Sequence, residues 1–296
     1  MKVLLTGGAG FIGGYVLDAL ANTGVDVRIC DIREPVHARN RPIEVIRGDA
    51  TNLEVLVRAV AGVDVVIHLI GVRDAQLAEA DPDTSFRRNV LSLHNVLEAC
   101  RLGGVRRVVF PSSAAVYGRT DKVPVSEEDH TRPTGIYAYH KWLCEELIRG
   151  YRATYGVHYT IFRVFNAWGP GNRNIIDHCI RAVKDGQPIT VFGADQLRDF
   201  IFVGDVARAF ALVVGNGVPE DRTINLGTGR GWTIRGVVRL VQNVFPGLGV
   251  TFAEKDGFIP YHSIADVTLA RTLLDFFAES SEALFARVIK EMANDA

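Results

Sequence analysis

Short apolar runs that alternate with helix-length segments are the feature that most constrains the fold of this chain. The runs are rich in Val, Ile and Leu and are bounded by Gly, Asp or Pro, which is typical of strands buried on both faces of a sheet. They comprise residues 3–5, 25–30, 43–46, 63–70, 108–110, 160–165 and 224–226. Strand–helix–strand alternation predicts right-handed crossovers and a doubly wound, mostly parallel sheet, so the fold class is α/β.

Helical periodicity fills the segments between these runs. Apolar stripes predict helices over residues 10–22, 90–101 and 136–155, and the last of these stops near Gly156. After about residue 167 the alternation fades, and residues 175–184, 232–245 and 266–290 look helical. We expect this second region to form a smaller lobe across the carboxyl edge of the sheet.

Composition limits the partners and the location that we expect. The chain has 296 residues, enough for one large α/β domain and a smaller appended one, and a net charge of −1 gives no basic surplus for nucleic acid. No signal peptide precedes the first strand, and no apolar run is long enough to span a bilayer. Four cysteines without a C-x-x-C pair fit reduced cytoplasmic thiols better than disulfides or a zinc site. We therefore expect a cytoplasmic protein without a metal, a membrane or nucleic acid as partner.

Three glycines form a candidate cofactor turn. Gly7, Gly10 and Gly13 follow the first strand directly and open the first helix. Backbone without side chains lets a pyrophosphate approach, and a helix N-terminus offers amide donors to it. A merely tight turn would show the same pattern, so further residues must support this interpretation.

Asp31 provides that support, because it ends the second strand 18 residues after Gly13. A carboxylate there binds the ribose hydroxyls and repels a 2′-phosphate, which favours NAD over NADP. Arg33 stands nearby as the residue that could accommodate NADP instead. Asp49 ends the third strand, where it could face the adenine amine or cap the following helix.

Tyr137 and Lys141 form a candidate catalytic pair, since a spacing of four places both on one helix face. A phenol loses its proton near pH 10, and an adjacent ammonium and an oxidised nicotinamide both favour the phenolate. Tyr137 could then remove a proton from a substrate hydroxyl while hydride leaves the same carbon, and Lys141 could hold the nicotinamide ribose. An isolated pair of this kind could equally be a packed tyrosine and a solvated lysine.

Two serines follow the fifth strand, at the sheet edge where open α/β sheets bind ligands. Ser113 could hydrogen-bond the reacting oxygen and align it with Tyr137. Ser112 is interpreted as a turn residue or a cofactor contact. These serines add the context that an isolated tyrosine–lysine pair lacks.

Taken together, these motifs resemble the extended short-chain dehydrogenase/reductases, in particular the NAD-dependent epimerase/dehydratase group. The resemblance runs through about residue 275. The matching segments are 6–13 (TGGAGFIG), 112–118 (SSAAVYG), Tyr137 with Lys141, 163–166 (RVFN), 169–171 (GPG), 198–203 (RDFIFV) and 225–227 (NLG). Each segment is modest, but their joint order and spacing are specific to the group.

The resemblance implies a parallel Rossmann sheet with a smaller C-terminal substrate-binding lobe. It assigns residues 1–166, with 199–230 returning to them, to NAD, and residues 167–198 and 231–296 to the substrate. The implied catalytic residues are Ser113, Tyr137 and Lys141. The implied NAD contacts are Gly7, Gly10, Phe11, Ile12, Gly13, Asp31, Ile32, Asp49, Ala50, Leu69, Ile70, Gly71, Arg73, Asn89, Ser112, Tyr137, Lys141 and Phe165.

The implied nucleotide-sugar contacts are Ser113, Tyr137, Asn166 and Arg198. Asn166 and Arg198 would hold the diphosphate, and a guanidinium fork suits that role because it binds phosphate bidentately. The family usually has a second arginine near the start of the C-terminal segment, where Lys255 stands here.

The activity implied is that of an NAD-dependent sugar-nucleotide epimerase, which inverts C4 of a UDP-sugar or other NDP-sugar through a transient 4-keto sugar. Dehydratases of the group carry an acidic residue just after the catalytic hydroxyl, whereas this chain has Ala114 and Ala115. An NAD(P)H-dependent 4-ketosugar reductase and a dinucleotide-binding regulatory protein are the alternatives. A homodimer is implied too, with residues 90–101 and 136–155 of two copies forming a four-helix bundle.

Overall fold

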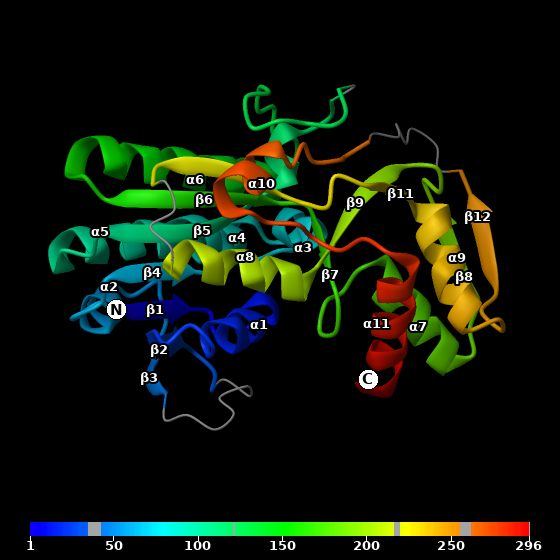
Figure 1. Cartoon of the computed structure of the whole chain (residues 1–296), viewed down its shortest axis with the longest axis horizontal. Coiled ribbons are helices and arrows are strands. Elements are labelled where there is room, and N and C mark those ends of the chain that lie inside the picture. The colour runs from blue at the N-terminus through cyan, green and yellow to red at the C-terminus, as the bar shows by residue number, and fades with distance from the viewer. Residues whose placement is uncertain (35–42, 121, 216–219, 255–261, 296) are drawn as a thin grey trace.

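Figure 1 shows the computed structural model of the chain, which describes residues 1–34, 43–120, 122–215, 220–254 and 262–295. Lys255 lies outside the described residues. Two parts are visible: a broad sheet with helices on both faces, and a smaller lobe beside it that carries the C-terminal helix (Figure 1).

Seven parallel strands form the broad sheet, in the order β10-β6-β5-β4-β1-β2-β3. Their bounds are β1 (Lys2–Thr6), β2 (Asp26–Asp31), β3 (Glu44–Arg47), β4 (Val65–His68), β5 (Arg107–Ser113), β6 (His158–Val164) and β10 (Arg222–Leu226). All seven strands predicted from apolar runs are confirmed. The strand order reverses between β1 and β4, and ligands of doubly wound sheets bind in the crevice at such a switch point.

Helices cover both faces of this sheet and create two hydrophobic cores. One face carries α1 (Phe11–Leu20), α8 (Val203–Gly215) and α10 (Thr268–Leu274). The opposite face carries α2 (Leu53–Ala59), α5 (Ser92–Gly103) and α6 (Ile136–Tyr155). Because both faces are buried, the strands can be continuously apolar, as the sequence pattern indicates.

The helix predicted over residues 90–101 differs from α5 at its start. A five-residue π-helix, η1 (Arg87–Leu91), precedes α5 and continues into it, after the short helices α3 (Ala75–Ala80) and α4 (Pro82–Phe86). A π-helical turn contains an extra residue compared with the 3.6 residues of an α-helical turn. The periodicity of apolar residues in the sequence therefore does not reveal it. Such turns occur frequently at functional sites, and this one carries Asn89.

The smaller lobe contains a three-stranded sheet, β11-β9-β7, and a two-stranded sheet, β12-β8. The strands are β7 (Asn166–Trp168), β8 (Ile189–Phe192), β9 (Leu197–Phe202), β11 (Gly231–Thr233) and β12 (Val250–Ala253). The helices are α7 (Ile175–Asp185), α9 (Ile234–Val244) and α11 (Glu282–Asp295). Stacked Trp168 and Phe285 rings, with centroids 4.3 Å apart, lie in its core.

Two of the three helical predictions for this region are confirmed, and the third is corrected. Residues 266–290 form two helices, α10 and α11, because Asp275 has a left-handed backbone (φ 49°) that ends α10. The short lobe strands were not predicted. The segment 199–230 is divided in the structure: β9 belongs to the three-stranded sheet, whereas α8 and β10 pack in the central domain.

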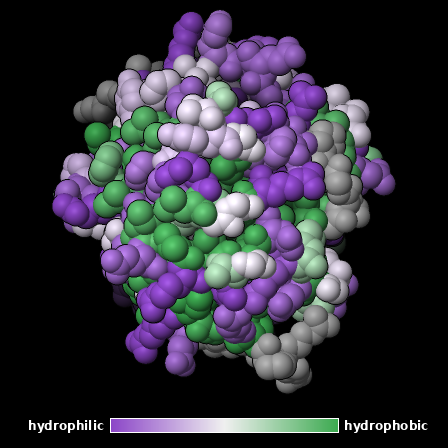
Figure 2. Space-filling model, turned by 90° about the vertical axis from the view of Figure 1, so that its left-hand side faces the viewer, coloured by the Kyte–Doolittle hydropathy of each residue, from purple (hydrophilic) through white to green (hydrophobic). Residues whose placement is uncertain are grey.

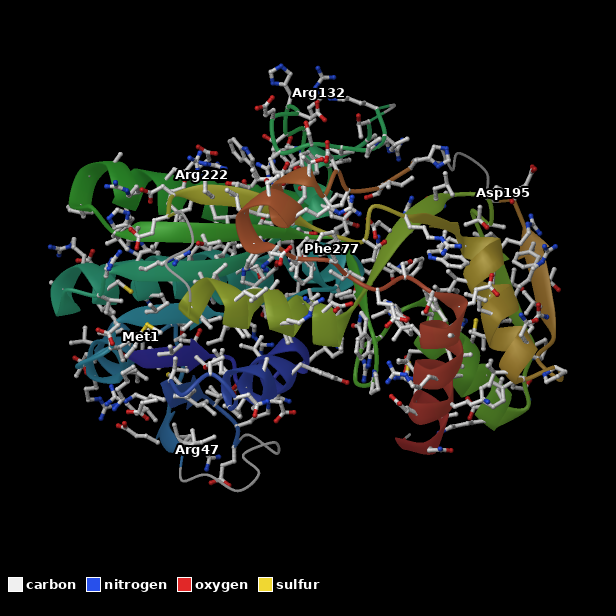
Figure 3. The ribbon with its side chains drawn as sticks, viewed as in Figure 1. Met1, Arg47, Arg132, Asp195, Arg222 and Phe277 are labelled. Atoms are coloured by element: carbon white, nitrogen blue, oxygen red, sulfur yellow. The ribbon has the colours of Figure 1, made fainter. Side chains whose placement is uncertain are left out.

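The two parts occupy opposite ends of the molecule. Met1 at the start of β1 and Asp195 in the lobe lie far apart in Figure 3. Figure 2 shows the face away from the lobe, where hydrophilic side chains surround smaller hydrophobic areas. Within the described residues, no helix combines the length and apolar character needed to cross a membrane.

Candidate active site

The glycine turn has the geometry of an anion cradle. Gly7 has a positive φ of 77°, and its carbonyl accepts a hydrogen bond from the Gly10 amide at 3.0 Å. A Cβ at Gly13 would lie 2.2 Å from the Gly7 oxygen, so any larger residue would push the turn apart. Gly10 caps α1 without a side-chain hydrogen bond, which leaves the first helix amides to a ligand. The turn therefore fits a dinucleotide pyrophosphate.

Asp31 is fixed against this turn. Its two oxygens accept hydrogen bonds from the Ala9 and Arg33 amides, each at 2.9 Å. The Arg33 guanidinium donates to the Ala9 carbonyl at 3.0 Å. A carboxylate held here offers its remaining lone pairs to the two hydroxyls of a ribose and repels a 2′-phosphate, which fits NAD.

The two alternatives for Asp49 are separated by the structure. The helix cap of α2 is Asn52, whose Oδ1 accepts the Glu54 amide at 2.9 Å. Asp49 is exposed, and in the described hydrogen bonds its carboxylate accepts only the Thr51 amide, at 2.8 Å. Ile32 is also exposed, and Ala50 is buried behind them. The adenine role of these three residues stays a prediction.

The predicted catalytic residues meet at the carboxyl end of β5. The Ser113 side chain lies close enough to the Tyr137 phenol to lower its pKa, and the Ser113 hydroxyl accepts the Ala115 amide at 3.2 Å. The Lys141 ammonium, one turn further along α6, is buried and donates to the Pro111 carbonyl at 2.8 Å. It also lies 4.6 Å from the centroid of the Phe110 ring. All three residues are thus held at one sheet edge.

Burial controls the protonation of this cluster. It raises the pKa of Tyr137, while the nearby Ser113 hydroxyl and the charge of Arg73 oppose that rise. Burial also lowers the pKa of Lys141 to about 8, while nearby Cys144 and Glu145 act in the opposite direction. The protein alone therefore favours the neutral phenol, and additional positive charge beside Tyr137 is needed to favour the phenolate.

A buried acceptor without a partner lies beside this cluster. Asn89 is 1% exposed, and its amide donates to the Ser85 hydroxyl at 3.1 Å. Its Oδ1 has no hydrogen-bond partner among the described residues. A Cβ at Gly71 would lie 2.4 Å from this oxygen and 3.9 Å from the Lys141 ammonium. An unsatisfied buried acceptor next to a glycine fits a site that a ligand completes.

Residues 169–171 reach from the lobe to the start of α1. The Tyr15 hydroxyl donates to the Pro170 carbonyl and the Arg73 guanidinium to the Gly171 carbonyl, each at 3.3 Å. The same guanidinium lies over the Phe11 ring, 4.9 Å from its centroid. Phe11 and Arg73, both predicted NAD contacts, thus lie together beside the glycine turn. Ile12 follows in α1, and Leu69 and Ile70 follow β4.

The predicted diphosphate residues share one face of the lobe sheet. Asn166 pairs with Phe200 in register, and Arg198 precedes Phe200 by two residues on the same strand. The Asn166 amide donates to the Asp199 carbonyl at 3.1 Å, and Arg198 donates to the Leu197 carbonyl at 3.0 Å and to Gln196. Both side chains are positioned by backbone contacts at the border of the two parts.

Two predicted NAD contacts are largely enclosed by protein. The Ser112 hydroxyl donates a hydrogen bond to the Glu145 carboxylate at 2.5 Å, and Ser112 is 3% exposed. This hydroxyl therefore already has a partner inside the protein. Phe165 is equally buried and packs near Tyr117. Contact of these two residues with a cofactor stays a prediction.

Sequence reasoning missed two buried carboxylates. Asp199 accepts hydrogen bonds from the Thr228 amide and hydroxyl, the Gly229 amide and the Ala265 amide, at 2.7 to 3.2 Å. Glu145 binds Ser112 and Arg163 inside the central domain. A charged residue four positions after Lys141, on the buried stripe of the long helix, was the available signal for Glu145.

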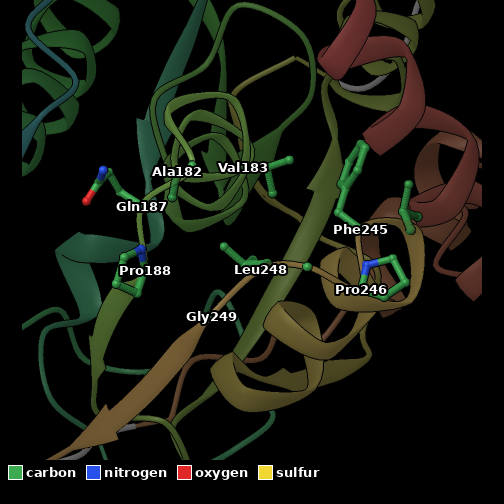
Figure 4. Close-up of a pocket in the computed structure, with 11 residues that line it drawn as sticks. Ala182, Val183, Gln187, Pro188, Phe245, Pro246, Leu248 and Gly249 are labelled. Atoms are coloured by element: carbon green, nitrogen blue, oxygen red, sulfur yellow. The ribbon is translucent and has the colours of Figure 1, made fainter.

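A pocket of about 490 Å³ lies elsewhere, between the ends of α7 and α9 (Figure 4). Pro188, Phe245 and Leu248 are among its mostly apolar lining residues, and none of the predicted site residues lines it. No group of three or more His, Cys, Asp or Glu side chains in the described part of the chain is arranged to hold a metal ion.

Known proteins are similar to this chain over most of its length. The model of the NAD dependent epimerase/dehydratase family matches residues 3–227. The UDP-glucose 4-epimerase of Azospirillum brasilense is 32% identical, over 86% of this chain and 80% of that protein.

Solved structures agree over the whole chain. MoeE5 in complex with UDP-glucuronic acid and NAD superimposes with a TM-score of 0.89 at 31% identity, and the match covers 100% of both chains. The UDP-glucose 4-epimerase of Thermotoga maritima, with UDP-glucose, gives a TM-score of 0.91 at 25% identity, over 100% of this chain and 99% of that one.

The doubly wound sheet, the glycine turn and the serine–tyrosine–lysine cluster define a dinucleotide-binding protein of the extended short-chain dehydrogenase/reductase type. Within that class, the chain belongs to the NAD dependent epimerase/dehydratase family.

Proposed function

We propose that this chain is an NAD-dependent sugar-nucleotide 4-epimerase that inverts C4 of a UDP-sugar or other NDP-sugar through a transient 4-keto sugar. The observation that carries the proposal is that Ser113, Tyr137 and buried Lys141 lie together at the sheet edge next to the glycine turn. Relatives named UDP-glucose 4-epimerase support the same activity.

The proton chemistry follows from the positions of these residues. Bound NAD supplies a reversible acceptor for the hydride on C4. Ser113 holds the C4 oxygen by a hydrogen bond, and Tyr137 takes the hydroxyl proton. When the other face of the 4-keto sugar is presented, Tyr137 returns that proton to the same oxygen. The hydride and the proton both return to the sugar, so the reaction has no net redox change.

Lys141 sets the pH range of this chemistry. Arg73 is the cation that acts on Tyr137 in the structure, and we assign further support of the phenolate to Lys141, whose pKa burial lowers to about 8. As the pH rises through that value, Lys141 loses its proton and its charge no longer stabilises the phenolate. We therefore expect activity to be present near neutral pH and to fall on the alkaline side.

We assign NAD to residues 1–166 with 199–230, and the sugar nucleotide to residues 167–198 and 231–296. In this assignment Arg198 and Asn166 bind the diphosphate, because a guanidinium fork and an amide suit phosphate oxygens. MoeE5 holds UDP-glucuronic acid and the Thermotoga maritima enzyme holds UDP-glucose, so both sugars belong in the test.

The test is conversion of UDP-galactose or UDP-glucuronic acid to the C4 epimer, with no cofactor added, alongside NAD quantification in the denatured protein. An epimerase carries NAD and converts at least one of these sugars. A 4-ketosugar reductase would convert neither and would require added NADPH or NADH. Activity that survives Tyr137→Phe would contradict the proposed site.

We further propose a cytoplasmic homodimer that pairs α5 and α6 of two copies. Exposed Leu102, Tyr139 and Tyr155 on these helices support the pairing, and four buried unpaired cysteines suit a reducing compartment. Light scattering after gel filtration tests it: a mass near 65 kDa is expected, twice the 32.5 kDa of the chain. A monomer at all concentrations would contradict the pairing.

A further inference from the structure

A fully buried carboxylate lies beneath the proposed catalytic cluster. Glu145 in α6 has no solvent exposure, and its oxygens accept hydrogen bonds from three side chains. Ser112 donates at 2.5 Å, Arg163 donates twice, at 2.8 and 3.1 Å, and Arg149 donates at 2.9 Å. A charge so buried is costly unless it is paired, and here Arg163 is buried beside it with 4% of its side chain exposed.

The partners of Glu145 come from three different elements. Ser112 is in β5, directly before Ser113, and Arg163 is in β6. Lys141 lies one turn before Glu145 in α6. Glu145 therefore joins the strand end that carries one proposed catalytic group to the helix that carries the other two.

Arg163 extends this connection under the loop that follows β5. Its guanidinium lies 4.7 Å from the centroid of the Tyr117 ring and donates to the Glu127 carbonyl at 3.3 Å. Tyr117 in turn donates its hydroxyl to Asn225 at 2.6 Å. The carboxylate is thus the centre of a satisfied polar network, and such networks hold a single arrangement of the chain.

We propose that Glu145 is a positioning residue for the proposed active site: its carboxylate holds the Ser112–Ser113 end of β5 against the turn of α6 that carries Lys141. This inference rests on the proposed function, because it requires Ser113, Tyr137 and Lys141 to be the reacting cluster. It adds a residue that touches neither the sugar nor the cofactor.

The negative charge of Glu145 also affects the protonation of Lys141. The groups that act on Lys141 are Cys144 and Glu145 in α6, and burial keeps neighbouring His68 in β4 neutral by lowering its pKa to about 3. Glu145 raises the pKa of Lys141 and so opposes the effect of burial. Its removal would also leave Arg163 as an uncompensated cation, whereas Arg149 would keep its ion pair with Glu146. The alkaline limit of activity should therefore move to lower pH.

The experiment compares Glu145→Gln with Glu146→Gln in the NAD-loaded protein, with UDP-galactose and UDP-glucuronic acid as probes. Glu146 also pairs with Arg149 but is exposed to solvent, so it is a matched control. We expect Glu145→Gln to lower kcat about tenfold at pH 8 and to shift the alkaline limb down by about one pH unit. We expect Glu146→Gln to match the wild type.

Two further variants keep the test decisive if Glu145→Gln does not fold. Ser112→Ala keeps the buried ion pair and removes only the link to β5; we expect kcat to fall about threefold with KM unchanged. Glu145→Leu combined with Arg163→Met removes both charges and is expected to fold, because paired apolar replacements are tolerated. Wild-type kcat and pH dependence in folded variants would overturn the inference.

Tyr137→Phe separates the two possible failures. If Tyr137→Phe is inactive while the Glu145 and Ser112 variants behave as wild type, only the proposed role of Glu145 is contradicted. If Tyr137→Phe retains activity, both the proposed active site and the proposed role of Glu145 are contradicted.

Discussion

The central domain and the lobe use buried polar groups very differently. At the carboxyl edge of the central sheet, Asp31, Asn89, Lys141 and Glu145 are all buried, and each is fixed by named contacts. The lobe buries the Asp199 carboxylate in β9, but its core is dominated by aromatic rings such as Trp168 and Phe285, and Asn166 is exposed at its border. The comparison indicates that the proposed reacting groups are held by the central sheet, whereas the proposed diphosphate contacts lie on a smaller and more apolar scaffold.

Tyr137→Phe is the change with the largest expected effect, and it acts only on the central domain. Removing the phenolic proton carrier should lower kcat about a thousandfold, since general acid–base groups contribute on that scale. The bound NAD content should be unchanged, because the glycine turn is untouched. Steady-state rates and NAD release on denaturation measure both; a loss of less than tenfold would contradict the role of Tyr137.

Arg198→Ala tests the proposed diphosphate contact in the lobe. Loss of the guanidinium should raise KM for the UDP-sugar about 30-fold, on the order of 2 kcal/mol, and leave kcat within a factor of about two. Initial-rate kinetics measure the change in KM against the change in kcat, and Arg235→Ala, at a half-buried arginine of the same lobe that pairs with Asp195, is the control. A loss confined to kcat would mean that Arg198 acts on the reaction step.

The pH dependence sharpens the assignment of Lys141. Because burial lowers the pKa of Lys141 to about 8, deprotonation above that value should reduce kcat about tenfold per pH unit. Rates between pH 6 and 10 measure the slope, and Lys141→Arg should move the alkaline limb upward, because a guanidinium keeps its proton. An unchanged limb in Lys141→Arg would assign the titration to another group.

Asp31→Asn should have the smallest effect. An amide accepts fewer hydrogen bonds than a carboxylate, so NAD should bind about threefold to fivefold more weakly, and the preference over NADP should narrow. Fluorescence titration of the apoprotein with both cofactors measures the two constants. Equal weakening for NAD and NADP would show that Asp31 acts only on the turn itself.

The sequence predicts the central domain well because its signals are local. Seven apolar runs, the spacing of Gly7, Gly10 and Gly13, and a tyrosine and lysine on one helix face are all visible within short windows. The lobe sheets were missed because β7 and β11 have only three residues each, too few to show an alternation. Glu145 was missed because its partner Ser112 is 33 positions away, a contact that only the folded chain creates.

The contacts that Tyr15 and Arg73 make with residues 169–171 link the lobe to the start of α1. A dinucleotide seated on the glycine turn would dissociate only after these two contacts open and the lobe shifts. We therefore expect the coenzyme to remain bound through many turnovers, like a prosthetic group. Turnover by the protein would then be insensitive to the cellular ratio of oxidised to reduced nicotinamide, which governs ordinary dehydrogenases.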